Sequence, residues 1–361
     1  MKPTTMTLLC LHFLLATAID DFEGWIDDAV RRYEDQSAFI MNADVTRPAL
    51  DGAVRDVEAK RTVITVRKDG AGDFKTITGA VRSIATGNWS RTIVKIGPGV
   101  YREKVTVDRA RPYVTFYGDP KNPPRIAYGA TARKVGTWSS ATVIVESDHF
   151  VAANVIFENS APRPKDGELG GQASALRISG DMAAFYNCKF LGYQDTLCDD
   201  VGRHYFNNCY MRGTVDFIFG NGKSLYEDCH MESVAKGVTA ITAQARMTPT
   251  EHSGFSFVRC SINGTGNATL SRAWKQSSRV VFLYTYMGRL IQPAGWDDKG
   301  NKSRDKTVFY GEYKCSGPGA NTDKRVRYSR LLTDTQAQPF LSKSFINADL
   351  WLSPPPNFIL K

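Results

Sequence analysis

A six-residue pattern of apolar and polar positions returns about every twenty residues in the middle of the chain. In each copy the first, fourth and sixth positions are mostly apolar, and turn residues lie between copies. The copies are FYNCKF (185–190), FNNCYM (206–211), YEDCHM (226–231), FVRCSI (257–262) and a degraded one, FLYTYM (282–287), with Thr285 in the cysteine position. The first three cysteines, Cys188, Cys209 and Cys229, are 21 and 20 residues apart. This period predicts the stacked coils of a solenoid.

The rest of the chain fits the same architecture. Residues 62–68 (TVITVRK) are predicted as a strand, a short helix begins at about Thr76, and residues 92–107 read as strand, turn and strand. From about Thr92 to Tyr310, short strand-like runs alternate with Gly, Asn and Asp turns, and no long helical period interrupts them. This pattern excludes alternating βαβ units. It predicts an all-β fold, a parallel β-helix.

The segments before and after the coils are both expected to pack against them. Residues 19–60 are predicted to form a helical cap, because four apolar residues follow helical spacing. They are Phe22, Trp25, Ile26 and Val30. The region after about Lys314 is predicted to be a tail with short helices packed back on the coils. Two polar stretches, 159–172 and 293–305, are predicted to be loops, and loops on a rigid scaffold often line a binding site.

The N-terminus is typical of a secretory signal peptide. Lys2 precedes an apolar run, Leu8 to Ala16, and an Ala16-Thr17-Ala18 cleavage site. The alternative is a buried N-terminal helix; the run is too short to span a bilayer, and no later segment is apolar enough to do so. The expected domains are therefore the signal peptide (1–18), the helical extension (19–60) and one catalytic domain (61–361).

Two further features agree with secretion. Four N-x-S/T sequons predict glycosylation, at Asn88, Asn263, Asn267 and Asn301. Loss of Cys10 with the signal peptide leaves six of the seven cysteines in an oxidising compartment. Strands of neighbouring coils lie about 4.8 Å apart, so Cys209 can reach Cys188 or Cys229. The alternative is a ladder of free, buried thiols.

The formal net charge of +9 favours an anionic partner. Nucleic acid is not expected outside the cell, whereas an acidic polysaccharide is. The other interpretation is that the charge serves solubility alone.

The chemistry-bearing residues keep the period of the coils. Asp195 and Asp216 are 21 residues apart, and Gln172 and Gln194 are 22 apart, so each pair is expected to lie on adjacent coils. Two close carboxylates resist joint ionisation, which yields one nucleophile or base and one protonated acid. Arg272 can orient the ionised carboxylate by a bidentate pair. The two amides can donate to an oxyanion, and the set predicts acyl transfer or ester hydrolysis.

Each of these residues also has a structural explanation. Aspartates in β-helix turns cap backbone N–H groups, glutamines form internal ladders, and Arg272 can be a surface cation. Trp274 and Trp296 can be core residues. No Ser-His pair in a G-x-S-x-G setting and no metal-ligand spacing of the five histidines is found in the sequence, so neither a metal nor a cofactor is expected.

The sequence resembles the plant pectinesterases (pectin methylesterases) from about Val63 to Pro354. The motifs that carry the resemblance are GDFKTI (72–77), GVYREKV (99–105), QASALR (172–177), YQDTL (193–197), GRHYF (202–206), DFIFG (216–220), SRAW (271–274), PAGW (293–296), YGEYKCSGPGA (310–320) and WLSP (351–354). Together they are highly specific, whereas YQDTL or DFIFG alone would be only suggestive.

The resemblance implies a right-handed parallel β-helix, secreted to the plant cell wall, that removes methyl esters from homogalacturonan. It implies Asp216 as the nucleophile, Asp195 as the general acid and base, Gln172 and Gln194 as the oxyanion hole, and Arg272 as the partner of Asp216. The substrate contacts implied are Thr137, Gln172, Phe219, Arg272, Trp274 and Trp296. It also implies a Cys209–Cys229 disulfide, a monomer and a proteinaceous inhibitor as partner.

The chain departs from the family in three places. Many relatives have an aromatic residue where this chain has Cys198, and Ser271 and Ala273 replace the usual Gly and Pro around Arg272. Only about forty residues separate the signal from the first strand of the catalytic domain, too few for the inhibitor-like pro-region of many plant members.

Two other functional classes fit the solenoid. One is another β-helix polysaccharide enzyme, a lyase or a polygalacturonase. A lyase would need a Ca²⁺-binding carboxylate cluster, and a glycosidase would need carboxylates flanking a sugar bond. The other is a non-catalytic wall protein that binds pectin.

Overall fold

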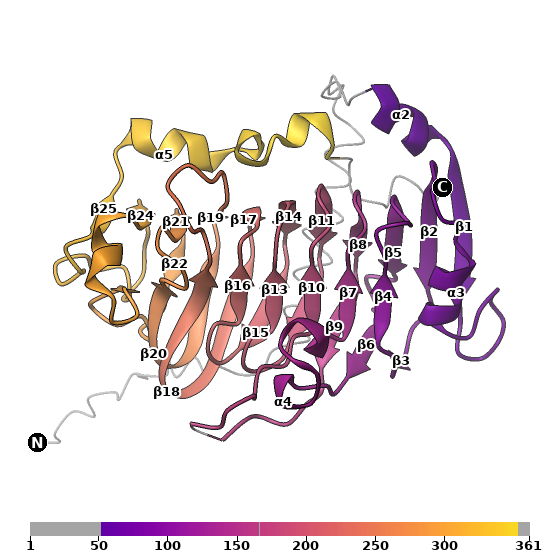
Figure 1. The fold of residues 1–361 in the computed structure, drawn as a ribbon, viewed down its shortest axis with the longest axis horizontal. Coiled ribbons are helices and arrows are strands. Elements are labelled where there is room, and N and C mark those ends of the chain that lie inside the picture. Colours follow the sequence, from indigo (N-terminus) through magenta and orange to yellow (C-terminus); the bar gives the residue numbers. More distant parts are fainter. Residues whose placement is uncertain (1–51, 166, 353–361) are drawn as a thin grey trace, which may run out of the picture.

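The computed structural model describes residues 52–165 and 167–352. Its strands stack in parallel along a single axis (Figure 1). The first face of the coil consists of β1 (Arg61–Val66), β2 (Arg91–Ile96), β5 (Val114–Gly118), β8 (Val151–Ala153), β11 (Ala183–Tyr186), β14 (Arg203–Asn207), β17 (Lys223–Glu227), β19 (Gly254–Val258), β21 (Arg279–Leu283), β24 (Phe309–Tyr313) and β25 (Ser329–Leu331). This arrangement is the predicted parallel β-helix.

Two long strands, β18 (His230–Gln244) and β20 (Ser261–Arg272), turn a corner and belong to both remaining faces. Their first halves join the second face, with β3 (Val100–Tyr101), β6 (Arg125–Tyr128), β9 (Ile156–Asn159), β12 (Lys189–Leu191), β15 (Tyr210–Gly213) and β22 (Tyr286–Met287). Their second halves join the third face, with β4 (Val105–Val107), β7 (Val143–Val145), β10 (Leu176–Ile178), β13 (Leu197–Asp199), β16 (Ile218–Gly220) and β23 (Trp296–Asp297). The third face carries the candidate site.

The repeated sequence pattern forms the corner between the first and second faces. The residue before each repeated cysteine has a left-handed backbone, with φ of 49° at Asn187, 51° at Asn208 and 56° at Asp228. Asn and Asp adopt this conformation more readily than most residues. The same turn in every coil brings the side chains that follow it into vertical register.

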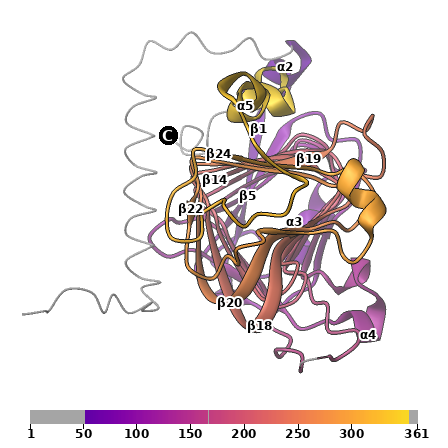
Figure 2. The ribbon, with the colours of Figure 1, turned by 90° about the vertical axis from the view of Figure 1, so that its left-hand side faces the viewer.

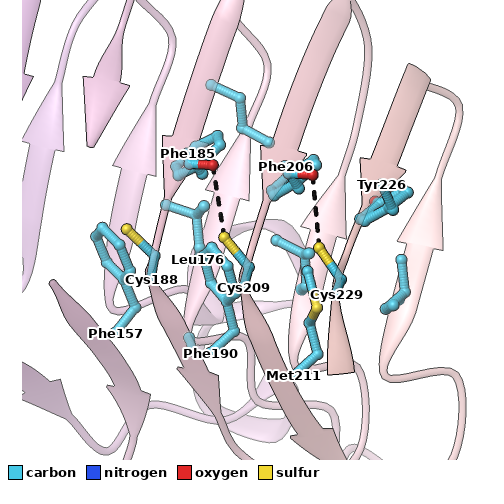
Figure 3. Close-up of a cluster of buried hydrophobic side chains, with 14 of the residues drawn as sticks. Phe157, Leu176, Phe185, Cys188, Phe190, Phe206, Cys209, Met211, Tyr226 and Cys229 are labelled. Carbon is cyan, nitrogen blue, oxygen red and sulfur yellow. Dashed lines mark hydrogen bonds between the residues drawn. The ribbon is translucent and has the colours of Figure 1, made fainter. Parts of the chain in front are cut away.

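Aromatic side chains stack along the interior (Figure 3). Ring centroids are 4.8 Å apart between Phe185 and Phe206, and 4.5 Å apart both between Phe206 and Tyr226 and between Tyr226 and Phe257. These residues pair directly across neighbouring strands. The one-coil period in the sequence is therefore a stack of rings in the core, where offset aromatic packing adds to the burial of apolar area.

The six cysteines among the described residues are free thiols. Cys209 donates to the carbonyl oxygen of Phe185 and Cys229 to that of Phe206, each at 3.5 Å (Figure 3). Burial raises the pKa of both thiols well above the usual value. The structure thus contains the ladder of buried thiols, and the Cys209–Cys229 disulfide implied by the resemblance is not formed in it.

The C-terminal tail packs on the outer side of the first face, as predicted. It contains α5 (Asp334–Leu341) and the 3-10 helices η3 (Lys343–Ile346) and η4 (Ala348–Leu350) (Figure 1). Thr333 caps α5 through its side chain and Gln336 returns the bond, which forms a capping box. Phe340, Phe345 and Trp351 are buried against strands of the first face. Figure 2 shows these helices and α4 (Ala132–Val135) on different sides of the coil.

The remaining helices are short: α2 (Gly52–Ala59), α3 (Ile77–Ser83), η1 (Trp138–Ser140) and η2 (Lys302–Lys306). Helix α2 belongs to the predicted N-terminal cap, and its Glu58 forms a buried ion pair with Arg91. The predicted signal peptide and the Phe22–Val30 stripe lie outside the described residues. No helix in the described part of the chain has the length and apolar character needed to cross a membrane.

Candidate active site

Asp195 and Asp216 occupy equivalent positions on adjacent coils of the third face. Leu197 of β13 pairs directly with Ile218 of β16, and each aspartate lies two residues before one of these partners. Both aspartates have a left-handed backbone, with φ of 61° and 53°, and both are almost fully buried, with 8% and 3% of their surface exposed. Adjacent coils are about 4.8 Å apart. The equal spacing in the sequence therefore does make the two acids vertical neighbours.

Arg272, the last residue of β20, holds Asp216 from the C-terminal side. Its Nε lies 2.7 Å from Oδ1 and 2.9 Å from Oδ2 of Asp216, and its Nη2 also donates to Oδ2. A guanidinium in this geometry fixes the orientation of a carboxylate and does not titrate in the working range. Arg272 therefore orients the carboxyl group of Asp216 and engages both of its oxygens.

The two carboxyls have different electrostatic surroundings. Burial, followed by the charge of Asp216, raises the pKa of Asp195 well above its usual value. Burial also raises the pKa of Asp216, but Arg272 opposes this rise through its hydrogen bonds and its charge. Asp195 is consequently the carboxyl that retains a proton more readily, and Asp216 is the one stabilised as an anion.

The two segments that carry the predicted amides adjoin each other next to Asp195. The backbone N–H of Ala173 donates to the carbonyl oxygen of Gln194 at 3.0 Å, which ties the two glutamine segments together. A Cβ placed on Gly171 would lie 3.3 Å from Oε1 of Gln194. The side chain of Gln194 therefore reaches the backbone next to Gln172. Both glutamines are half-buried. The structure thus brings the two amide-bearing segments together beside the acids.

A family model described as Pectinesterase matches residues 63–349 of the chain. The chain belongs to the pectinesterase family. This pectinesterase is 46% identical to Pectinesterase 2 of Olea europaea over 318 residues, which cover 88% of this chain and 87% of the relative. It is 45% identical to Pectinesterase QRT1 of Arabidopsis thaliana over 301 residues, covering 81% and 79%.

Solved structures show the same fold. Pectin methylesterase from carrot superposes with a TM-score of 0.75 at 33% identity, and the match covers 80% of this pectinesterase and 94% of the carrot chain. A pectin methylesterase in complex with a hexasaccharide gives a TM-score of 0.69 at 27% identity, covering 81% and 98%. Within the described residues, no group of three or more His, Cys, Asp or Glu side chains is arranged to hold a metal ion.

Several predicted substrate contacts surround the acids of this pectinesterase. Phe219, in β16, is half-buried and pairs with Cys198 of β13, whose thiol is buried. The indole of Trp274, two residues after Arg272, is 44% exposed. Thr137 is half-buried at the start of η1, two coils before Asp195. These positions agree with contact to a bound polymer, which stays a prediction.

The prediction for Trp296 is wrong. Its side chain is 2% exposed, stacks on Tyr310 with ring centroids 4.5 Å apart, and donates from Nε1 to Oε1 of Glu312 at 2.9 Å. The reason is that Trp296 lies in a strand, β23, whose residues alternate between core and surface. A ring packed in the core of the pectinesterase cannot stack on a sugar.

One residue beside the site was not singled out from the sequence. The ammonium of Lys299 lies 3.6 Å from the ring centroid of Trp274. It lies in the polar stretch 293–305, which the sequence identifies only as a loop. The available signal was the Asp297-Asp298-Lys299-Gly300 run, a typical turn sequence.

Proposed function

We propose that this pectinesterase removes methyl esters from homogalacturonan, releasing methanol and leaving free carboxylates on the polymer. The observation that supports this most directly is the pairing of Asp216 with Arg272 through both carboxylate oxygens, on the coil next to Asp195. Binding alone does not require a buried nucleophile held in this way. The basic sequence also suits an acidic polymer.

In the first step, the Asp216 carboxylate attacks the C6 carbonyl carbon of a methylated galacturonate. The carbonyl oxygen becomes an oxyanion, and amide N–H groups of Gln172 and Gln194 donate to it. The bond to the methoxy group then breaks. Asp195, the carboxyl that retains its proton, gives that proton to the departing oxygen, so that methanol leaves.

The product of this step is an anhydride between Asp216 and the sugar. Asp195, now ionised, takes a proton from water, and the resulting hydroxide attacks the same carbonyl carbon. A second oxyanion forms at the amides. Its collapse returns Asp216 as a carboxylate paired with Arg272 and releases the galacturonic acid carboxyl group, which then loses its proton to solvent. Asp195 remains protonated for the next cycle.

The direct test is an assay of methanol and of chain length on highly methylated pectin. We expect the wild type to release methanol without shortening the polymer, and Asp195→Asn to lose most of this activity because it cannot transfer a proton. Shortened chains without methanol would instead indicate a polygalacturonase, and unsaturated ends a lyase. Sugar binding without turnover would indicate a binding protein.

The amide pair can be tested separately. Gln172→Ala and Gln194→Ala should each lower kcat about a hundredfold to a thousandfold, because removal of one oxyanion donor costs about that much. KM should change little if the amides act mainly in the transition state. Steady-state methanol release measures both constants. A rise in KM with unchanged kcat would assign the glutamines to ground-state binding instead.

Processing of the chain is also a proposal. We infer secretion to the cell wall after removal of residues 1–18, with residues 19–60 preceding the catalytic domain, and glycans on the exposed Asn267 and Asn301. Asn88 should stay unmodified, because its Nδ2 donates to Ser90 O at 2.5 Å and to Thr92 Oγ1 at 3.2 Å. Mass spectrometry of the secreted protein checks these modifications.

Non-reducing peptide maps decide between a Cys209–Cys229 bridge and free thiols.

A further inference from the structure

Lys299 is placed directly over an exposed aromatic ring beside the catalytic residues. Its Nζ is 3.6 Å from the ring centroid of Trp274, well inside the range of a cation–π contact. Trp274 follows Arg272 by two residues, and Arg272 pairs in register with Asp297, two residues before Lys299. The ammonium and the guanidinium are therefore carried by adjacent coils on the same side of the molecule.

The loop that carries Lys299 is held firmly in place. Lys299 has a left-handed backbone, with φ of 57°, and its N–H donates to Oδ1 of Asp297 at 2.7 Å. Arg304 joins this loop to the neighbouring one, because its Nη1 donates to Ala273 O at 2.9 Å and to Asp298 O at 3.1 Å. The position of Lys299 relative to the site is thus determined by the fold.

Lys299 lies among cations. Burial, followed by the charge of Arg272, lowers its pKa from the usual value, and Arg304 and Lys275 act in the same direction against an opposing effect of Asp216. Among the described residues, no carboxylate forms an ion pair with Lys299, whereas Arg272 is paired with Asp216 and Lys302 with Asp298. The ammonium is available to an anion that comes from outside the chain.

The chemistry of the substrate identifies that anion. A sugar stacked on the face of Trp274 that Lys299 covers would have to displace the ammonium. A galacturonate residue that has already lost its methyl ester carries a carboxylate, which an ammonium over an aromatic ring can pair with directly. A methylated residue has no such charge and gains nothing from Lys299.

We propose that Lys299 binds the carboxylate of an unesterified galacturonate residue near the ester that reacts, and that it makes the enzyme favour partly de-esterified pectin. This inference rests on the proposed function. It assigns Lys299 a role in substrate selection, whereas the proton transfers and the nucleophilic attack remain with Asp195 and Asp216.

The test uses unesterified oligogalacturonate as a competitive inhibitor of methanol release from highly methylated pectin. Lys299→Met should raise the inhibition constant about fivefold, the size expected for one partly exposed ion pair, and Lys299→Arg should restore it. High salt should weaken inhibition of the wild type more than inhibition of Lys299→Met. The same variant should lose the preference, in kcat/KM, for partly over fully methylated pectin.

The chain offers a control in Lys314, a second lysine over an aromatic ring, which unlike Lys299 is paired with a carboxylate, Asp334 Oδ1 at 3.5 Å. It also has a left-handed backbone, with φ of 47°, and its Nζ lies 4.8 Å from the ring centroid of Tyr313, at the corner of the first face. Lys314→Met should leave the inhibition constant unchanged. If it raised the constant as much as Lys299→Met does, the effect would come from the loss of one positive charge anywhere on the protein, and the proposal would be overturned.

Other outcomes also separate the possibilities. An unchanged inhibition constant in Lys299→Met, with or without a shifted pH profile, would overturn the role of Lys299 and leave the esterase function standing. A wild type that releases no methanol from any pectin would overturn the proposed function itself. Circular dichroism and thermal unfolding of each variant establish that it is folded, and the salt dependence of wild-type inhibition gives a test without any substitution.

Discussion

Asp216→Asn should abolish methanol release, with kcat reduced about ten-thousandfold or more, as when the nucleophile of a hydrolase is removed. The asparagine side chain has nearly the same shape, but its neutral amide is a poor nucleophile and cannot form the anhydride. It also leaves Arg272 without its anionic partner. Initial rates of methanol release at matched substrate saturation measure the effect.

Asp200→Asn provides the control for this substitution. Asp200 directly follows β13 of the same face, its pKa is also raised by burial, and its Oδ2 accepts from Ser179 Oγ at 2.7 Å. It takes no part in the proposed reaction, so the variant should keep activity within about twofold. If Asp216→Asn retained a tenth or more of the wild-type kcat, Asp216 would not be the nucleophile.

Arg272→Met should have the second largest effect, a fall in kcat of about a thousandfold, because it removes both the orientation and the charge that stabilise the Asp216 carboxylate. It should also change the pH dependence. In the wild type, Arg272 opposes the rise of the Asp216 pKa that burial causes. Without the guanidinium this pKa rises further, so the ionised fraction at any given pH falls and the acid limb of the rate profile moves to higher pH.

Arg272→Lys separates geometry from charge. Lysine keeps the positive charge but not the two parallel hydrogen bonds, so we expect a smaller shift of the acid limb and a large loss of kcat. Arg203→Met is the matched control, since Arg203 pairs with Asp181 through Nε at 3.0 Å and Nη2 at 2.6 Å on the first face. It should lower thermal stability without moving the pH profile. An unshifted acid limb in Arg272→Met would contradict the electrostatic role.

The arrangement of the acids follows from the sequence because the coil length is visible in it. Once the repeated cysteines establish a period near 21 residues, the same spacing between Asp195 and Asp216 places them on adjacent coils. The pairing of Leu197 with Ile218 gives the same offset. Where the repeat is interrupted, the sequence does not show which residues of a strand point to the core and which to the solvent. Trp296 lies in a two-residue strand inside a polar stretch, so its orientation towards the core had no sequence pattern to indicate it.

The position of Lys299 required the folded chain for a different reason. A turn sequence predicts that a turn forms but not the direction in which its side chains point. That direction comes from the Asp297 carboxylate and from Arg304, which joins two loops about thirty residues apart. Likewise, the cysteine spacing fits a bridge and a row of thiols equally well, so the sequence alone does not choose between them.

The C-terminal helices have a consequence for how the molecule comes apart. In a solenoid each coil touches only its neighbours, so an array can fray from its ends one coil at a time. Here η3 packs against β14 and β17, and α5 packs against β19 and β21, so one short tail links four consecutive strands of the first face. If any of these coils separates, apolar side chains of the tail that pack against it become exposed to water as well. We therefore expect the coils from β14 to β21, which include those carrying Asp216 and Arg272, to open as one cooperative unit.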